Sequence, residues 1–566
     1  MTQWLAKRAR AATTAPLEIR NKKIPDVIVQ ILQNRGYTSA QDIEKYFAPS
    51  LSDLHDPFLF NDMEKAVDRI MGAFHRKQRI LVHGDYDTDG ITGTALIVSN
   101  LRKLGGDVEY YIPHRLREGY GLSLSGINRA IKQQCQVIIT VDCGITAVRE
   151  IKRAREHGID VIVCDHHKPE TQLPHACALI NAKIPGCAYP FKELAGVGVG
   201  FKLLNALYAK LNRPRAEIHA DLDLVALGTV VDIVPLVDEN RTMVKYGMNK
   251  LLKSKKAGFQ ALLAETGLKK GVTAYHLGFI IGPRVNACGR LHDAHEALDM
   301  FLVDDKEVAR EHARNLSRHN AQRQAIEAKM YEDARALIDQ EKLHQDRVIV
   351  VGREEWHPGV VGIVASKLSD DYYKPTVLLA LDRDAARGSA RSISGFDITS
   401  ALGACHEVLT AFGGHTQAAG LELDRKHVPE LRTCLNRYAQ NCDAEIFTEK
   451  KMYDLKLDLD EISEEVIHFL KYFEPTGFAN PQPVFLGENC EVVGVPRVVG
   501  TNHLRCALRQ NGVAYQAIAY GRAGDILNIE VGKTRVDCLY SISEDSFFGK
   551  KKVVLKIKDM RRSHAA

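Results

Sequence analysis

Three apolar runs in the first half of the chain end in acidic residues or histidines, and they predict three buried strands. The runs are Arg79–Val82, Val137–Val141 and Val161–Cys164, and stretches with helical periodicity separate them. Strands that alternate with helices are typical of a parallel sheet covered by helices on both faces. The alternation extends from about residue 60 to residue 240. It predicts an α/β domain in this part of the chain.

The second half of the chain contains three different patterns. The segment from Asp304 to Asp346 has no glycine or proline and is rich in Ala, Glu, Arg, Lys and Gln, which predicts one long helix. A second alternation of strands and helices begins at Val348–Val351 and predicts a smaller α/β domain. From about Met452 onward, short β-rich segments are separated by turn residues. That pattern is typical of a small barrel such as the oligonucleotide-binding (OB) fold.

These patterns divide the chain into several domains, because 566 residues are too many for a single hydrophobic core. The fold class is α/β, with two α/β domains joined by a long helix and followed by a β-barrel. The expected parts are an N-terminal helical segment at 1–50, a larger α/β domain at 51–303, a connecting helix at 304–346, a smaller α/β domain at 347–450 and a barrel at 451–566.

Polar residues directly after the three strands are the strongest candidates for chemistry. In an open α/β sheet, ligands bind beyond the carboxyl ends of the strands, so side chains placed there converge. Asp232 adds a carboxylate within an apolar run, where an ionised group is costly unless it is paired or binds a metal. Carboxylate oxygens and imidazoles suit hard divalent ions such as Mg²⁺ and Mn²⁺. The positions after the strands are His83, Asp85, Asp87, Asp89, Asp142, Asp165, His166 and His167.

Taken singly, these residues have simpler interpretations. An aspartate after a strand is usually a helix cap, and a pair of histidines is more often found at the surface or in packing. Their joint occurrence at three strand ends favours a metal site instead. Two ions in such a site would stabilise both the attacking and the leaving oxygen of a phosphoryl group during hydrolysis. Asp85 and Asp165 could orient a ligand from behind rather than bind metal themselves.

The cysteines, the N-terminus and the lengths of the apolar runs indicate the cellular compartment. The twelve cysteines include no CxxC pair, which favours reduced thiols over a disulfide framework or a zinc ribbon. The N-terminus has no apolar signal segment, and no apolar run is long enough to cross a membrane. We therefore expect a cytoplasmic protein without a membrane span. The net charge of +5 is small for this length and says little about a polyanionic partner.

The strand-end motifs resemble those of a known family. The spacing His83-x3-Asp87-x-Asp89, the isolated Asp142 and the sequence Asp165-His166-His167 are similar to the motifs of the DHH phosphoesterase superfamily. Within it, the chain most resembles the RecJ group of single-strand exonucleases. Two later stretches extend the resemblance over essentially the whole chain. Gly282–Arg290 resembles a RecJ motif that follows the catalytic core, and Phe412–Gly420 resembles the GGH-x-x-A-A-G signature of the DHHA1 domain.

The resemblance implies a DHH domain, a DHHA1 domain and a C-terminal OB-fold, with two Mn²⁺ or Mg²⁺ ions as cofactors. His167 would then polarise the scissile phosphate or assist the leaving group, with Asp85 as a second candidate catalytic residue. The metal ligands that it implies are His83, Asp87, Asp89, Asp142, His166 and Asp232.

Cationic and polar residues outside the metal motifs are candidates for binding nucleic acid. Arg115 follows a predicted strand near the first acidic loop and could contact a phosphate or form a surface ion pair. In the predicted loop at Gly282–Arg290, guanidinium groups could clamp phosphates. The resemblance further implies recognition of the 5′ end in the DHHA1 domain. The candidates beyond Arg115 are Arg284, Asn286, Arg290, Ser389, Arg391 and His415.

The resemblance implies a 5′→3′ exonuclease that is specific for single-stranded DNA, releases 5′-mononucleotides and acts in DNA recombination and repair. It also implies a single-strand-binding protein and a DNA helicase as partners. The oligomeric state is open at this point, and we expect a monomer. Two alternatives remain open: a DHH phosphodiesterase of short oligonucleotides or cyclic dinucleotides, and a non-catalytic replication or repair scaffold. The C-terminal barrel argues against the first alternative. The intact set of ligands argues against the second.

Overall fold

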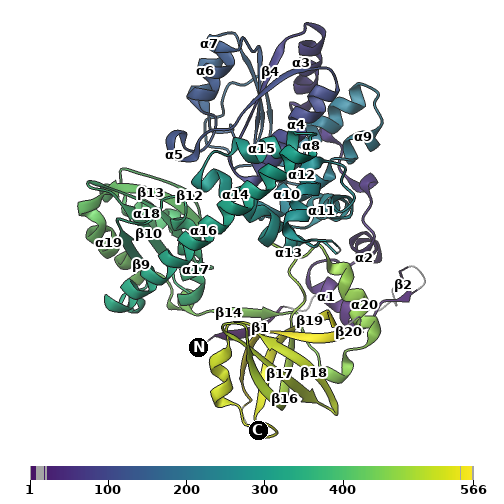
Figure 1. Cartoon of the computed structure of the whole chain (residues 1–566), viewed down its shortest axis with the longest axis vertical. Coiled ribbons are helices and arrows are strands. Elements are labelled where there is room, and N and C mark those ends of the chain that lie inside the picture. The colour runs from purple at the N-terminus through teal and green to yellow at the C-terminus, as the bar shows by residue number, and fades with distance from the viewer. Residues whose placement is uncertain (1, 8–17, 20–21, 270, 548–549, 564–566) are drawn as a thin grey trace. The chain divides into compact units, whose positions relative to one another are not determined.

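The computed structural model describes residues 2–7, 18–19, 22–269, 271–547 and 550–563. The chain forms two compact units (Figure 1). The first comprises residues 55–234 and 238–449. The second combines residues 2–54 and 235–237 with residues 450–566. No helix within the described ranges has both the length and the apolar composition that crossing a membrane requires.

A five-stranded sheet, all parallel, forms the centre of the first unit, as the alternating pattern predicted. Its central strands are almost fully buried, because helices cover both faces. On one face, α6 (Leu124–Lys132) and α7 (Val148–Glu156) pack on the sheet through one apolar cluster. The other face carries α4 (Thr88–Lys103) and α8 (Gly196–Lys210). In spatial order the strands are β5 (Asp107–Tyr111), β4 (Arg79–Gly84), β6 (Val137–Val141), β7 (Asp160–Cys164) and β8 (Ala178–Ile180).

Helices follow the sheet and lead to the predicted long helix. That helix is confirmed as α16 (Lys306–Gln340), which has 35 residues. It begins at Asp305, whose carboxylate accepts hydrogen bonds from the amides of Glu307 and Val308, a typical N-cap. It ends before a short 3-10 turn at Leu343–Gln345 and is therefore shorter than the glycine-free segment. The preceding helices are α10 (Leu222–Val231), α11 (Asp238–Leu251), α12 (Ala257–Thr266), α14 (Gly282–Leu291) and α15 (His295–Leu302).

The smaller α/β domain after α16 contains a mixed five-stranded sheet. Its strands β9 and β10 are parallel, and its other neighbours are antiparallel. The helices are α17 (Val361–Tyr372), α18 (Ile398–Ala404) and α19 (Val428–Gln440). The strands lie in the order β12 (Ala411–His415), β13 (Ala418–Asp424), β11 (Ala385–Arg391), β10 (Thr376–Leu381) and β9 (Ile349–Arg353).

The predicted loop at Gly282–Arg290 is a regular element instead, and the binding candidates of the smaller domain also lie in regular elements. Gly282–Arg290 lies within helix α14, and Ser389, Arg391 and His415 lie in strands β11 and β12. The presence of glycine did not distinguish a loop from a helix or a strand at these positions. Gly282 and Gly289 allow close packing, since a Cβ on Gly289 would lie 2.5 Å from the backbone oxygen of Tyr86. The glycines of β11 and β12 sit in the strand ladders.

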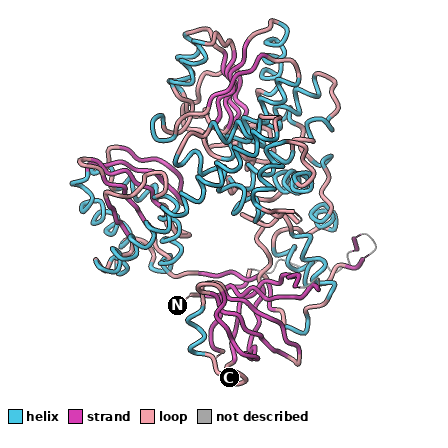
Figure 2. The backbone as a smooth tube through the Cα atoms, viewed as in Figure 1, coloured by secondary structure: helices cyan, strands magenta, loops and turns pink. Residues whose placement is uncertain are grey.

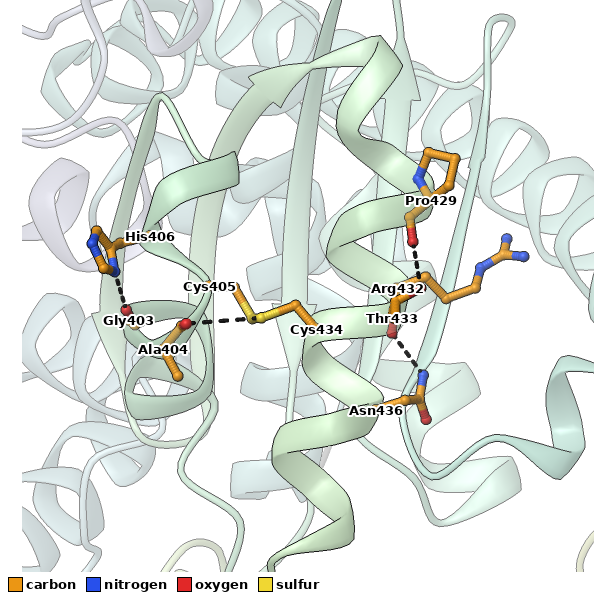
Figure 3. The surroundings of a disulfide bond; sticks show 9 residues. All are labelled: Gly403, Ala404, Cys405, His406, Pro429, Arg432, Thr433, Cys434 and Asn436. Atoms are coloured by element: carbon orange, nitrogen blue, oxygen red, sulfur yellow. Dashed lines mark hydrogen bonds between the residues drawn. A yellow bond between two sulfur atoms is a disulfide. The ribbon is translucent and has the colours of Figure 1, made fainter.

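The cysteines include a disulfide, which corrects the expectation that all thiols are reduced. Cys405 follows α18 and is bonded to Cys434 of α19, with 6.0 Å between their Cα atoms (Figure 3). The pair is separated by 29 positions in the sequence, and cysteines that meet on two packed helices leave no spacing signature. Ten other cysteines in the described chain are free thiols.

The second unit is built around the predicted C-terminal barrel (Figure 2). Strand β16 pairs with both β17 and β19, which closes the sheet. Residues before position 50 join this unit: α1 (Asp26–Asn34) and α2 (Ala40–Phe47) share its apolar core with α20 (Glu464–Leu470). The barrel strands are β16 (Phe485–Val499), β17 (His503–Gln510), β18 (Val513–Ala519), β19 (Arg535–Phe547) and β20 (Lys550–Arg562).

Candidate metal centre and catalytic site

The carboxyl ends of β4, β6 and β7 bring the predicted polar residues together. Three sets of ligand atoms lie within 4.8 Å of one another. Asp85, Asp87 and Asp142 form one set, and Asp89, His166 and Asp232 form another. Asp142 also lies in the third set, with His166 and His167, so it connects the two groups. Each group has the donor types that a hard divalent cation takes.

Asp142 occupies the centre of this arrangement. It follows β6 with a left-handed backbone (φ 61°), a conformation that aspartate tolerates better than most residues. Its Oδ1 lies 3.1 Å from Nε2 of His166, and the same nitrogen lies 3.5 Å from Oδ2 of Asp232. Carboxylates from β6 and from the end of α10 therefore face one imidazole.

Burial makes this cluster unfavourable without a cation. The pKa values of Asp85 and Asp142 are raised well above the ordinary range, first by burial and then by neighbouring carboxylates. The same causes raise the pKa of Asp89 to about 7. Burial lowers the pKa of His166 to about 3, which keeps its imidazole neutral, as a metal ligand must be.

Several polar atoms of the cluster also lack hydrogen-bond partners within the described structure. They are Oδ1 of Asp85, Oδ1 of Asp142, Oδ2 of Asp232 and Nε2 of His166. Buried polar atoms are rarely left unpaired, and a shared cation would satisfy all four at once. The residues present therefore fit divalent metal ions.

His83, which we expected among the metal ligands, lies apart from these groups. It is fully buried within β4, and its Nε2 accepts a hydrogen bond from the amide of Ser123 at 3.3 Å. A Cβ on Gly126 of α6 would lie 2.4 Å from the imidazole, so the ring is packed beneath that helix. His83 lies within β4, whereas Asp85 lies beyond the end of the strand, where the alternation of side chains no longer fixes its direction, and it reaches the cluster.

Asp165 holds His167 rather than joining the metal groups. One carboxylate oxygen of Asp165 lies 2.7 Å from Nδ1 of His167, and the other accepts a hydrogen bond from the amide of Ile145. The His167 side chain lowers the pKa of Asp165 to about 2 despite its burial. Asp165 in turn raises the pKa of His167, although burial opposes this. Tyr120, which no sequence motif indicates, also contacts this histidine, because its hydroxyl lies 2.9 Å from the same Nδ1.

The glycine at the start of α8 is needed for space beside the cluster. A Cβ on Gly196 would lie 2.6 Å from Cβ of Asp142, and the Gly196 amide donates a hydrogen bond to Asp89 at 2.6 Å. Substituting Gly196 with alanine is expected to displace Asp142 and to lower the rate of any reaction at this centre by about 10²-fold. Gly198→Ala is the matched control, because its Cβ would make ordinary contacts of 3.5 Å with Leu194. Equal initial rates for the two variants would contradict this role of Gly196.

Three arginines lie together next to the carboxylates. Arg115, at the start of α5 (Arg115–Glu118), and Arg290 of α14 line a cavity of about 280 Å³ with Asp87 and Asp232. Burial and then the charges of Arg115 and Arg391 lower the pKa of Arg290 to about 9. None of these arginines forms an ion pair with a carboxylate in the described part of the chain. A cluster of unpaired guanidinium groups is a binding site for an anion.

The smaller domain contributes Arg391 and Ser389 to this anion site. The Arg391 guanidinium donates a hydrogen bond to Oγ of Ser389 at 2.7 Å. A Cβ on Gly362 would lie 2.8 Å from Nη2 of Arg391, which places both side chains at the first turn of α17. Helix N-termini favour anions because their amides and dipole point outward.

The remaining candidates for binding nucleic acid differ in their position relative to the cavity. Asn286 lies in the cavity wall, and its side-chain oxygen accepts hydrogen bonds from the amide and hydroxyl of Thr88, both at 2.8 Å. Arg284 instead contacts Oγ of Ser317 and the backbone oxygen of Ile280, and it does not line the cavity. His415 lies exposed on the edge strand β12, and its pKa is lowered by partial burial and then by the charge of His167.

Comparison with known proteins agrees with this arrangement. Family models match residues 79–229 (DHH family, N-terminal domain), 345–441 (DHHA1 domain) and 453–559 (RecJ OB domain). The single-stranded-DNA-specific exonuclease RecJ of Bacillus subtilis is 38% identical over 542 residues, which cover 95% of this chain and 68% of that protein. The RecJ exonuclease of Escherichia coli is 35% identical over 87% of this chain and 88% of its own length.

A solved structure is similar over nearly the whole chain. RecJ of Thermus thermophilus in complex with Mn²⁺ superposes with a TM-score of 0.83 at 30% identity, covering 96% of this chain and 76% of that chain. The same protein was also solved with Mg²⁺, with a TM-score of 0.74. These matches and the geometry of the site show that this chain belongs to the RecJ family of single-stranded-DNA-specific exonucleases.

Proposed function

We propose that this protein is a metal-dependent exonuclease that degrades single-stranded DNA from its 5′ end and releases 5′-mononucleotides. The observation that carries the proposal is the pairing of two oxygen- and imidazole-rich groups with three unpaired arginines in one site. The carboxylates and imidazoles can hold cations, and the arginines can hold phosphate groups of the substrate. Family membership makes single-stranded DNA the substrate.

Two divalent ions, Mn²⁺ or Mg²⁺, would be held by these two groups, which the contact between Asp142 and His166 connects. When bound, they supply Lewis-acid stabilisation of the attacking and leaving oxygens. Side chains of the protein would position the substrate and transfer the proton. Arg115 and Arg290 would hold the scissile phosphate against the carboxylate cluster, and Asn286 keeps the acidic loop in place through Thr88.

His167 is the residue that we assign to proton transfer. Its Nδ1 is held by Asp165, so Nε2 is directed toward a substrate oxygen. Because Asp165 raises the pKa of His167, the imidazolium form is favoured and can donate a proton to the leaving oxygen. Asp85 lies with Asp87 and Asp142, so we assign it to metal binding rather than to proton transfer.

Two exposed aromatic rings mark a path for the strand beyond the cleft. Tyr275 and Phe279 are 61% and 72% exposed, and their rings stack with centroids 5.0 Å apart. Phe279 lies in a π-helical turn, Leu277–Ile281, which packs on the end of α10: a Cβ on Gly278 would lie 3.7 Å from Val230. π-Helical turns are frequent at functional sites, and exposed rings stack with unpaired bases.

Replacing Phe279 with alanine is therefore expected to weaken the binding of long single strands by roughly 5- to 150-fold, since one stacked base contributes about 1–3 kcal/mol. Hydrolysis of a dinucleotide should remain unchanged. Phe58→Ala removes a half-exposed ring elsewhere and is the matched control. Fluorescence anisotropy in EDTA measures the affinity, and equal affinities for wild type and Phe279→Ala would contradict this path.

The overall proposal is tested with a single-stranded oligonucleotide that carries a label at its 3′ end. We expect progressive shortening from the 5′ end with Mn²⁺ and no cleavage with EDTA. An intact strand together with rapid hydrolysis of dinucleotides would assign the protein to the phosphodiesterases of short oligonucleotides instead.

We further propose, from family membership, that the protein acts in the cytoplasm as a monomer during DNA recombination and repair. A single-strand-binding protein and a DNA helicase would be its partners. Co-purification from cells of the source organism, with and without nuclease treatment, would test these associations.

A further inference from the structure

A second group of metal-ligating side chains lies outside the catalytic site, where α14, α15 and α16 meet. Cys288 of α14, Glu296 of α15 and His319 of α16 each offer one ligand atom, and these atoms lie within 4.8 Å of one another. Their donor set is a thiol, a carboxylate and an imidazole. It differs from the catalytic groups, which contain oxygen and nitrogen donors but no sulfur.

Burial and hydrogen bonding distinguish this group from a surface cluster. Cys288 is fully buried, and its thiol lies 2.8 Å from the backbone oxygen of Asp293. His319 is 8% exposed, and its Nδ1 has no hydrogen-bond partner within the described residues. Its Nε2 lies 3.2 Å from Glu296. An unpaired, buried imidazole nitrogen beside a buried thiol needs a further partner.

Two more histidines border the group. The ring of His292 lies 4.0 Å from that of His319, measured between centroids. Nδ1 of His312 lies 3.4 Å from Glu296, whose carboxylate also accepts a hydrogen bond from Asn315 at 2.7 Å. One of these imidazoles or a water molecule could complete a tetrahedral set of four ligands. Tetrahedral sites of sulfur, nitrogen and oxygen donors are typical of Zn²⁺, whereas Mg²⁺ and Ca²⁺ prefer oxygen.

We propose that Cys288, Glu296 and His319 bind a Zn²⁺ ion that is separate from the catalytic metals. On binding, the thiol S–H bond breaks, the proton passes to solvent and the thiolate coordinates the ion.

The ion would join three helices around the substrate cleft. Helix α14 carries Asn286 and Arg290 into the cavity on one side, and Cys288 lies between them in sequence. Connecting Cys288 to α15 and α16 would fix the position of α14 and therefore of the Arg290 guanidinium. This role is structural, since none of the three ligands lines the catalytic cavity.

Cobalt spectroscopy tests this proposal on the full-length protein. The purified protein is stripped of metal and titrated with Co²⁺, whose bond to a thiolate gives a charge-transfer absorption band that oxygen and nitrogen ligands do not give. We expect the band to saturate at one equivalent and Zn²⁺ to displace it. The band should disappear in Cys288→Ala and His319→Ala. It should persist in Cys506→Ala, which removes a buried cysteine of the barrel, and in Asp142→Asn, which alters the catalytic site.

The wild-type protein alone can overturn the proposal, so the test does not depend on the folding of a variant. Absence of a thiolate band in wild type, or an unchanged band in Cys288→Ala, would exclude this site. Elemental analysis of protein purified without chelator gives a second measurement, with one zinc per chain expected. A wild-type value near zero would also exclude it. Neither readout depends on nuclease activity.

Discussion

Replacing Asp142 with asparagine is expected to abolish nuclease activity and, in the absence of metal, to stabilise the fold. Asp142 is a member of one ligand group and lies 3.1 Å from His166 of the other, so its loss affects both cations that we propose. Metal stabilisation of the transition state amounts to several kcal/mol, which corresponds to a rate loss of about 10³-fold or more. Asparagine keeps the size of the side chain and tolerates the left-handed backbone at this position.

The expected gain in stability follows from electrostatics. Asp142 is 2% exposed, and burial followed by the charges of neighbours such as Asp89 and Asp232 raises its pKa well above the ordinary value. A neutral amide removes this repulsion. Thermal unfolding in EDTA should therefore give a higher melting temperature for the variant than for wild type. With Mn²⁺ the order should reverse, because an ion at 100 times its Kd stabilises the native wild type by about 2.7 kcal/mol.

The same cluster predicts how stability depends on pH in EDTA. A carboxylate whose pKa is raised in the folded state binds more protons there than in the unfolded state, so stability falls as pH rises. For Asp89 the loss begins near its ordinary pKa of 3.8 and is complete above about 7. The melting temperature of wild type in EDTA should therefore decrease over this interval.

Asp160→Asn is the matched control for these measurements. It removes a carboxylate from the opposite end of the same sheet, at the start of β7, where Asp160 pairs with Arg69. Its activity should equal that of wild type, and it should gain no stability in EDTA. An active Asp142→Asn variant, or one that is less stable than wild type in EDTA, would contradict the assignment of Asp142.

The sequence predicted the carboxyl ends of the strands well, because buried parallel strands are continuous apolar runs with visible ends. Strand β6 matches the predicted Val137–Val141 residue for residue. What a run of residues does not show is the direction in which each side chain points. His83 and Asp85 are two positions apart in one motif, yet the first is packed beneath α6 and the second reaches the carboxylate cluster.

Features that depend on contacts between distant segments could not be read from local patterns. The disulfide joins residues 405 and 434 across two helices, and the N-terminal helices pack on the core of the C-terminal barrel. Glycine-rich stretches predict loops, but close packing can also require glycine inside a helix, as at Gly289. No sequence pattern predicts the stack of Tyr275 and Phe279, because the exposure of an aromatic ring depends on the fold.

Replacing Arg391 with alanine is expected to remove the preference of the enzyme for a 5′-phosphate. Arg391 and Ser389 lie at the first turn of α17, where a terminal phosphate would meet both a guanidinium group and the helix N-terminus. Hydrogen bonds to a charged group contribute about 1.5–3 kcal/mol, so kcat/KM for a 5′-phosphorylated strand should fall roughly 10- to 150-fold. The value for a 5′-hydroxyl strand should hardly change.

Arg387→Ala provides a control on the same strand and the same face of the sheet, because its guanidinium pairs with Glu422 at 3.1 Å. Arg391→Lys should recover only part of the preference, since a lysine carries the charge without the planar fork. An equal loss on both substrates would assign Arg391 to the scissile phosphate or to folding instead.

The unpaired arginines and the crowded carboxylates share one physical basis. Each cluster concentrates charge that the folded protein cannot neutralise by itself, and a phosphate and divalent cations are the ions that would neutralise them.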